Sequence, residues 1–121
     1  LDVVFWNERY STGLFAATFS DIIIVECKNW SHKVSSEEIG WFRVKLADRG
    51  QKFGILIAAN GITGDAHLLT RAYDILNKAL IAGIYILVVT REDIERLSNS
   101  EDLVKLLKQR ICDLVVKSTI S

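Results

Sequence analysis

The chain has 121 residues, half of them hydrophobic, and equal numbers of acidic and basic side chains. This length predicts one domain with its own core. Zero net charge neither supports nor excludes a nucleic-acid partner, because a basic face can coexist with an acidic one. No apolar run reaches the roughly 18 residues of a membrane span, and no signal-peptide pattern opens the chain. The two cysteines, Cys27 and Cys112, are too few for a disulfide framework and indicate a reduced, cytoplasmic protein.

The N-terminal part of the chain is rich in β-forming residues. Segments 1–6 (LDVVFW) and 14–28 (LFAATFSDIIIVECK) are separated by the polar stretch NERYSTG, which predicts two or three strands in a meander. The chain starts inside a strand-like run without a Met, and we therefore expect its natural N-terminus to lie upstream. A helix of about 14 residues follows, with a capping box at Ser35 and Glu38 and an end at Gly50.

The second half alternates strands and helices. Segment 53–59 (FGILIAA) is a wholly apolar strand, and 84–90 (IYILVVT) is another. Between them the apolar spacing predicts a helix ending at Gly83. A turn around residues 91–97 precedes a final amphipathic helix from Ser100, whose core-facing positions are predicted as Leu103, Leu106, Leu107, Ile111, Leu114 and Val115. The last three of these could instead form a homodimer face.

This order predicts an α/β sandwich with a mixed central sheet. The N-terminal strands are expected to be antiparallel and the later ones to be joined by helical crossovers. A flavodoxin-like regulatory domain, which has a parallel sheet, is the alternative fold that the same alternation allows.

The strand at 22–28 ends in charged residues. Ile22 to Val25 are typical of a buried strand, yet Glu26 and Lys28 follow on one pleat face, with Cys27 on the other. A surface ion pair at the rim of the sheet would explain the two charges. A site is the other explanation, because a charge on a core strand needs a partner, water or a metal.

Asp2 favours a metal site. It lies in the first predicted strand, and pairing of the two strands would bring it within about 5 Å of Glu26, measured between Cβ atoms. Two carboxylates this close repel each other unless a cation lies between them, and Mg²⁺ is typically held by one or two carboxylates and waters. Lys28 would add a positive charge for a water or a transition state. Asp21, five residues before Glu26, is the rival acidic residue.

Asp2, the triplet Glu26-Cys27-Lys28 and the following helix resemble the PD-(D/E)xK nuclease superfamily, in particular its Mrr-like restriction endonuclease branch. The segments VECKNWSHKVSSEEIGWF and ADRGQKFGILIAANGITGDA resemble that branch as well, so the likeness covers about residues 1–80. Leu1 stands where the family often has Pro, and the opening helix and first strand of the family are missing.

The resemblance implies a restriction endonuclease-like three-layer sandwich spanning residues 1–121 as a single nuclease-type domain. It implies Mg²⁺-dependent hydrolysis of phosphodiester bonds in DNA, with Mn²⁺ as a substitute metal. In that scheme Asp2, Glu26 and the backbone carbonyl of Cys27 bind the metal, and Lys28 positions the attacking water. Asp2, Glu26 and Lys28 are thus the expected catalytic residues.

A local excess of positive charge follows the triplet along the chain. Residues 28–52 hold three more basic than acidic side chains, and such side chains supply the sequence-independent part of nucleic-acid binding. Lys33, Arg43 and Lys45 are the predicted nucleic-acid contacts, although a solvated helix face explains each of them equally well. Trp30 and Trp41 could stack on bases, but core positions are favoured for both.

Other functions remain open at this point. A nucleic-acid-binding or assembly module could keep the fold without cleavage, and a nuclease with another task, on branched DNA or on RNA, could use the same core. A homodimer, or a recognition domain or partner outside this chain, is compatible with cutting both strands of a duplex. The sequence reveals neither the target sequence nor any dependence on methylation.

Overall fold

The structure, a computed structural model, describes residues 2–6, 22–28, 31, 33–62 and 66–120. In these ranges, strands alternate with helices after an initial strand pair. The strands are β1 (Asp2–Trp6), β2 (Ile22–Lys28), β3 (Phe53–Ala58) and β4 (Tyr85–Val89). The helices are α2 (Ser36–Asp48), α3 (Ala66–Ile81), α4 (Arg91–Glu95) and α5 (Ser100–Ile120).

The strands form one mixed sheet in the order β1-β2-β3-β4. β1 pairs with β2 in antiparallel fashion, whereas β2, β3 and β4 are parallel to one another. The predicted mixed sheet is confirmed. The antiparallel β1 excludes the flavodoxin-like alternative, because that type of domain has a parallel sheet.

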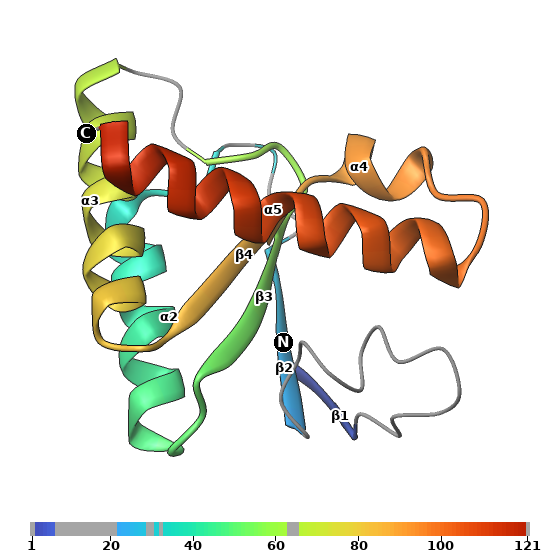
Figure 1. Cartoon of the computed structure of the whole chain (residues 1–121), viewed down its shortest axis with the longest axis horizontal. Coiled ribbons are helices and arrows are strands. Elements are labelled where there is room, and N and C mark those ends of the chain that lie inside the picture. Colours follow the sequence, from blue (N-terminus) through green and yellow to red (C-terminus); the bar gives the residue numbers. More distant parts are fainter. Residues whose placement is uncertain (1, 7–21, 29–30, 32, 63–65, 121) are drawn as a thin grey trace.

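Helices cover both faces of this sheet. α2 and α3 lie on one face, and α5 crosses the other (Figure 1). Each face of the sheet has its own hydrophobic core, and alternate residues of a strand point into one or the other. Ile24 and Leu56 pack with α2 and α3, whereas Ile23 and Ile55 pack with α5. The restriction endonuclease-like three-layer sandwich is therefore confirmed.

Helix α2 begins and ends where the sequence predicts. The Ser35 hydroxyl accepts a hydrogen bond from the Glu38 backbone N–H at 3.4 Å and donates one to the Glu38 carboxylate at 3.0 Å. After Asp48 the chain turns at Gly50, whose φ of +64° is the left-handed conformation that glycine adopts without strain. The stripe of Ile39, Phe42 and Leu46 is fully buried. These two ends fix which side chains of α2 lie over β2.

A glycine in β3 allows α2 to approach the sheet closely. A Cβ atom at Gly54 would lie 2.7 Å from Phe42 Cζ and 2.8 Å from Leu46 Cδ1, both closer than real Cβ contacts. Since Gly54 is paired with Ile24 of β2, this close approach lies beside the strand that carries the charged triplet. The depth of α2 over the sheet therefore depends on this missing side chain.

Two C-terminal details differ from the prediction. Residues 91–95 form the short helix α4 and not a turn; its capping box joins the Thr90 hydroxyl to the Asp93 N–H and the Asp93 carboxylate to the Thr90 N–H. In α5, Val104 is buried, whereas Val115 is 45% exposed, so the expected core position of Val115 was wrong. Val115 follows the buried Leu114 by about 100° around the helix, which turns it away from the core.

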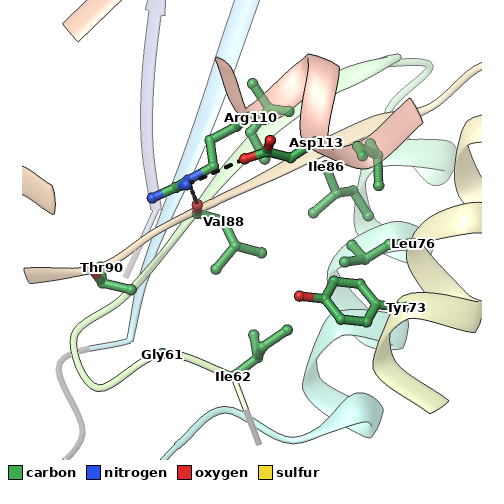
Figure 2. A pocket seen from close by; sticks show the side chains of 11 residues that line it. Gly61, Ile62, Tyr73, Leu76, Ile86, Val88, Thr90, Arg110 and Asp113 are labelled. Atoms are coloured by element: carbon green, nitrogen blue, oxygen red, sulfur yellow. Dashed lines mark hydrogen bonds and ion pairs between the residues drawn. The ribbon is translucent and has the colours of Figure 1, made fainter. Parts of the chain in front are cut away.

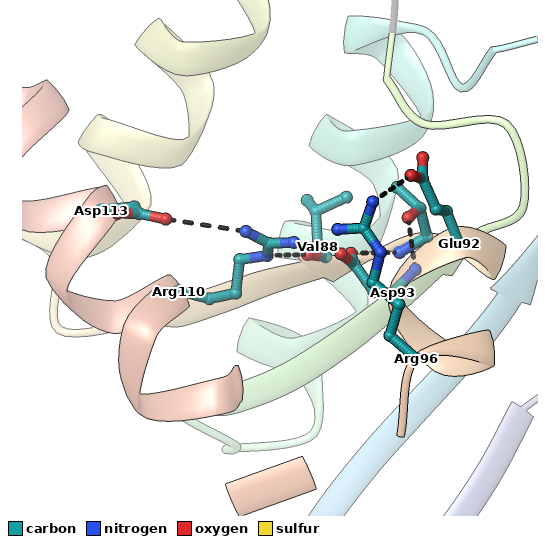
Figure 3. A network of polar contacts seen from close by, with 7 residues as sticks. Val88, Glu92, Asp93, Arg96, Arg110 and Asp113 are labelled. Carbon is teal, nitrogen blue, oxygen red and sulfur yellow. Dashed lines mark hydrogen bonds and ion pairs between the residues drawn. The ribbon is translucent and has the colours of Figure 1, made fainter. Parts of the chain in front are cut away.

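Arg110 ties α5 to β4 and α4 (Figure 3). Its Nε donates to the Val88 carbonyl at 3.2 Å, and its Nη atoms lie 2.6 Å from an Asp93 carboxylate oxygen and 3.6 Å from an Asp113 carboxylate oxygen. Burial raises the pKa of Asp93, but the hydrogen bonds from Thr90 and Arg110 outweigh it and hold that pKa below its ordinary value.

Among the described helices, none is long and apolar enough to cross a bilayer.

Candidate active site

The carboxyl end of β2 carries the candidate site. Glu26 and Lys28 share the sheet face that α2 covers, and Cys27 packs on the other face against the core beneath α5. Glu26 is only 6% exposed, whereas Lys28 is half-buried. A carboxylate at that depth is costly unless a cation or hydrogen-bond donors compensate its charge.

The strand register places Asp2 directly opposite Glu26. The predicted pairing of these two residues is therefore observed, and residues opposed in this way generally have Cβ atoms about 5 Å apart. Of the two residues, the structure describes the Glu26 side chain and the backbone of Asp2. The neighbouring Val4 is 60% exposed, so solvent reaches β1 at the edge of the sheet.

Lys45 of α2 supplies the cation that Glu26 requires. Its ammonium Nζ forms an ion pair with Glu26 Oε1, and the two side chains are 28% and 7% exposed, respectively. Lys45 was also predicted to contact nucleic acid, which stays a prediction; the structure places its ammonium on the Glu26 carboxylate. The residues are 19 positions apart, so no local spacing reveals this contact.

Beyond Lys28, the ends of the parallel strands form a groove of about 460 Å³. The Lys28 carbonyl accepts a hydrogen bond from the Ala59 N–H at 3.1 Å, and this links the end of β2 to the loop after β3. Lys33 and Arg91 bring two positive charges to the groove, and Glu92 and Glu95 bring two negative ones. The lining residues are Lys33, Ala59, Asn60, Gly61, Thr90, Arg91, Glu92 and Glu95. Lys33 was predicted from the sequence, whereas Arg91 was not, because no motif connects Arg91 to the triplet.

Arg43 does not share a surface with Lys45. Arg43 and Lys45 are two residues apart, so their side chains are separated by about 200° around the helix axis. They therefore leave α2 on opposite flanks of its buried stripe. The Nε of Arg43 is buried and has no hydrogen-bond partner among the described residues. Lys33, Arg43 and Lys45 therefore do not form one basic face.

Trp41 is 67% exposed, so the core position predicted for it was wrong. It lies one turn before Lys45 on the same flank of α2, because residues four apart are neighbours on a helix. Both residues line a shallow groove of about 500 Å³ with Val44, Asp48 and Arg49. Trp30 and the rival acidic residue Asp21 lie outside the described residues.

The donor set at this position suits a divalent cation. Among the described side chains, no group of three or more His, Cys, Asp and Glu residues gathers. The donors expected from the sequence are the carboxylates of Asp2 and Glu26 and the backbone carbonyl of Cys27. Only two of these donors are side chains, so they would not form such a group. Oxygen donors match Mg²⁺ and Mn²⁺. The buried Glu26 carboxylate already binds a cationic group, which shows that positive charge fits beside it.

A separate cavity of about 170 Å³ lies between β4, α3 and α5. Figure 2 shows Tyr73, Leu76 and Ile86 among its lining residues, with the ion pair of Arg110 and Asp113 at its side. Of the described side chains at the end of β2, neither Glu26 nor Lys28 is part of its lining. The cavity is thus distinct from the charged end of β2.

Comparison with protein families identifies the chain. No curated protein matches it significantly. The family model described as restriction endonuclease, of the Mrr type, matches residues 2–97. The match includes the antiparallel strand pair, the triplet of β2 and helix α2 that supports it. With most of its length matched, the chain belongs to the Mrr-type restriction endonuclease family, a family of nucleases.

Proposed function

We propose that this chain is a metal-dependent endonuclease that hydrolyses phosphodiester bonds in DNA. Its family supports nuclease chemistry. The observation that carries the proposal is the register in which Asp2 lies opposite Glu26, with Lys28 on the same sheet face as Glu26. This arrangement supplies one acidic ligand from β1, a second from β2, and an amine at the carboxyl end of β2.

The residues divide the chemistry as follows. Asp2, Glu26 and the Cys27 carbonyl would hold Mg²⁺, and Mn²⁺ could replace it. The bound metal would act as a Lewis acid and lower the pKa of a coordinated water. Lys28 orients the attacking water and stabilises the negative charge that develops on the phosphate. Its position on the metal-binding face, two residues beyond Glu26, suits this role.

DNA approaches from the carboxyl ends of the parallel strands. The groove beside Lys28 carries Lys33 and Arg91, which can contact phosphates without regard to base sequence. Lys33 is exposed and follows the triplet by five residues. The exposed Trp41 offers a flat surface on which a base could stack, a contact that tolerates any sequence.

Plasmid cleavage tests this function directly. Supercoiled DNA is incubated with the full chain in Mg²⁺, in Mn²⁺ and in a chelator. Nicking or linearisation is expected with either metal and not with the chelator. The variants Glu26→Gln and Lys28→Met should each lose at least about 100-fold of the rate, the scale on which single electrostatic contributors act.

The matched control is Lys105→Met, which removes an exposed positive charge from α5 on the opposite face of the sheet. This variant should cleave like the unaltered protein. Circular dichroism verifies that each variant folds. Full activity in a folded Glu26→Gln or Lys28→Met protein would contradict the assignment. Duplex, branched and single-stranded DNA, together with RNA, are compared in the same assay to identify the substrate.

One observation favours a second function. Because Lys45 neutralises Glu26 within the protein, the carboxylate could be permanently occupied, and the chain would then be a nucleic-acid-binding or assembly module that does not cleave. Titration with Mn²⁺ separates the two functions: the nuclease binds the metal through Asp2 and Glu26, and the inactive module does not.

A further inference from the structure

We propose that the Lys45 ammonium is the resident cation of Glu26 in the metal-free protein, and that a divalent metal must displace it to bind. This inference rests on the proposed function. Lys45 lies outside the set of Asp2, Glu26 and Lys28. By occupying Glu26 in the absence of metal, it sets the metal affinity of the site.

Burial makes a cation beside Glu26 necessary. Glu26 is almost fully enclosed, and Lys45 is the partner that its carboxylate oxygen Oε1 contacts. Removal of one member of such a pair leaves an uncompensated charge in the interior, which is strongly unfavourable. The metal-free fold therefore uses the Lys45 contact to stabilise Glu26.

Lys45 and a metal ion would compete for the same Glu26 carboxylate. Asp2 lies opposite Glu26 in the strand register, and two neighbouring carboxylates require positive charge between or beside them. An ammonium and a metal ion both satisfy that requirement at the Glu26 carboxylate. Simultaneous close contact would bring two positive charges together, so each cation weakens the binding of the other.

The Lys45 side chain can move while the backbone of α2 stays fixed. The α2 backbone is anchored by the buried Phe42 and Leu46 and by their close contact with Gly54. The Lys45 side chain, in contrast, has a flexible four-carbon stem, is 28% exposed, and borders the open groove beside Trp41. The ammonium can therefore leave Glu26 for this groove while the helix stays in place.

Isothermal titration calorimetry with Mn²⁺ measures the competition. The full chain is compared with Lys45→Met, which keeps an unbranched side chain one atom shorter and removes its charge, and with the control Lys105→Met. We expect about a tenfold decrease in the Kd of Lys45→Met for Mn²⁺, a typical size for coupling between two binding events. Lys105→Met should match the unaltered chain. An equal or larger Kd in folded Lys45→Met overturns the inference.

A second measurement needs no charge-removing variant. The side-chain ammonium groups of ¹⁵N-lysine-labelled protein are observed by NMR, and the Lys45 signal is identified by its loss in Lys45→Arg. Mg²⁺ should shift this signal, and the Mg²⁺ concentration at half of the shift should agree with the Kd from Mg²⁺ calorimetry. A Lys45 signal that is unchanged at metal saturation overturns the inference. If metal binds the unaltered chain and Lys45→Met equally, only the role of Lys45 fails. If neither protein binds metal, the proposed metal site fails with it.

Discussion

At the scale of single residues, Glu26 determines how the candidate site works. It is a buried carboxylate at the end of a core strand, held by Lys45 from α2 and faced by Asp2 from β1. A buried carboxylate is a good cation ligand, because water does not compensate its charge and a bound cation must do so. Lys28, at the end of β2, and Lys33, in the groove beyond it, are two further positively charged side chains.

Lys33 carries a prediction about DNA affinity. As an exposed lysine in the groove beside Lys28, it should contact a phosphate. Lys33→Ala is expected to weaken binding of duplexes of any sequence and to reduce the slope of log K against log salt by about 1. Fluorescence anisotropy at several salt concentrations measures both, in Ca²⁺ so that cleavage does not interfere. An unchanged slope would place the DNA elsewhere, and Lys105→Ala is the control.

Asp93 carries a prediction about pH. Its pKa is lowered in the folded protein by hydrogen bonds from Thr90 and Arg110 that outweigh the effect of burial. The carboxylate therefore stabilises the fold above its unfolded pKa of about 3.9, and this stabilisation is lost as pH falls through the lower folded pKa. Asp93→Asn should decrease the free energy of unfolding by about 1–2 kcal/mol at pH 7. Denaturation from pH 7 to pH 2 should show the difference disappearing; a constant difference would contradict this account.

At the scale of elements, the contact of α2 with β3 decides where Lys45 lies. Gly54→Ala would push a methyl group against Phe42 and Leu46, which are fully buried and have little room to move. We expect a loss of about 1–3 kcal/mol in the free energy of unfolding, measured by urea denaturation. Gly40→Ala is the matched control: it lies in α2 with no atom near the added Cβ and should stabilise the helix by roughly 0.5–1 kcal/mol. Equal effects of the two substitutions would contradict the close approach.

The elements themselves follow largely from local sequence. Periodicity located the described strands and the helices α2, α3 and α5, because apolar spacing reports which side of an element is buried. The capping residues Ser35 and Gly50 marked the ends of α2 for the same local reason. Helix α4 was missed although Thr90 and Asp93 have capping-box spacing, since five residues carry too little periodic signal.

The candidate site was less accessible to prediction. Asp2, Glu26 and Lys28 were selected from their strand positions and from a family resemblance, and the register then placed Asp2 opposite Glu26. The contact of Lys45 with Glu26 and the position of Arg91 beside Lys33 arise from tertiary packing between distant segments. The exposure of Trp41 likewise depends on which flank of α2 faces the sheet, which a single helix does not specify.

At the scale of the whole molecule, α5 completes the domain although the family match ends at residue 97. Val104 and Leu107 of this helix cover the core formed by Ile23, Val25, Phe53, Ile55, Leu87 and Val89, and Arg110 fastens the helix to β4 and α4. Residues 1–121 therefore form, in our proposal, a single domain whose second core exists only with α5 in place.

A truncation tests that dependence. A chain ending at residue 97 should lose cooperative thermal unfolding and bind a hydrophobic dye, because one face of the sheet would be exposed to water. A chain ending at residue 116 retains Leu107 and Leu114 and should unfold cooperatively. Circular dichroism during heating distinguishes the two chains. A cooperative transition in the shorter chain would mean that α5 is not part of the domain core.

The central claim is that Asp2 and Glu26 bind one divalent cation between β1 and β2. Anomalous diffraction from a crystal of the full chain soaked in Mn²⁺ tests it most directly. The account predicts a Mn²⁺ peak within bonding distance of both carboxylates, with the Lys45 ammonium moved away from Glu26. Carboxylates that point apart, with no peak between them and Lys45 still on Glu26, would contradict it.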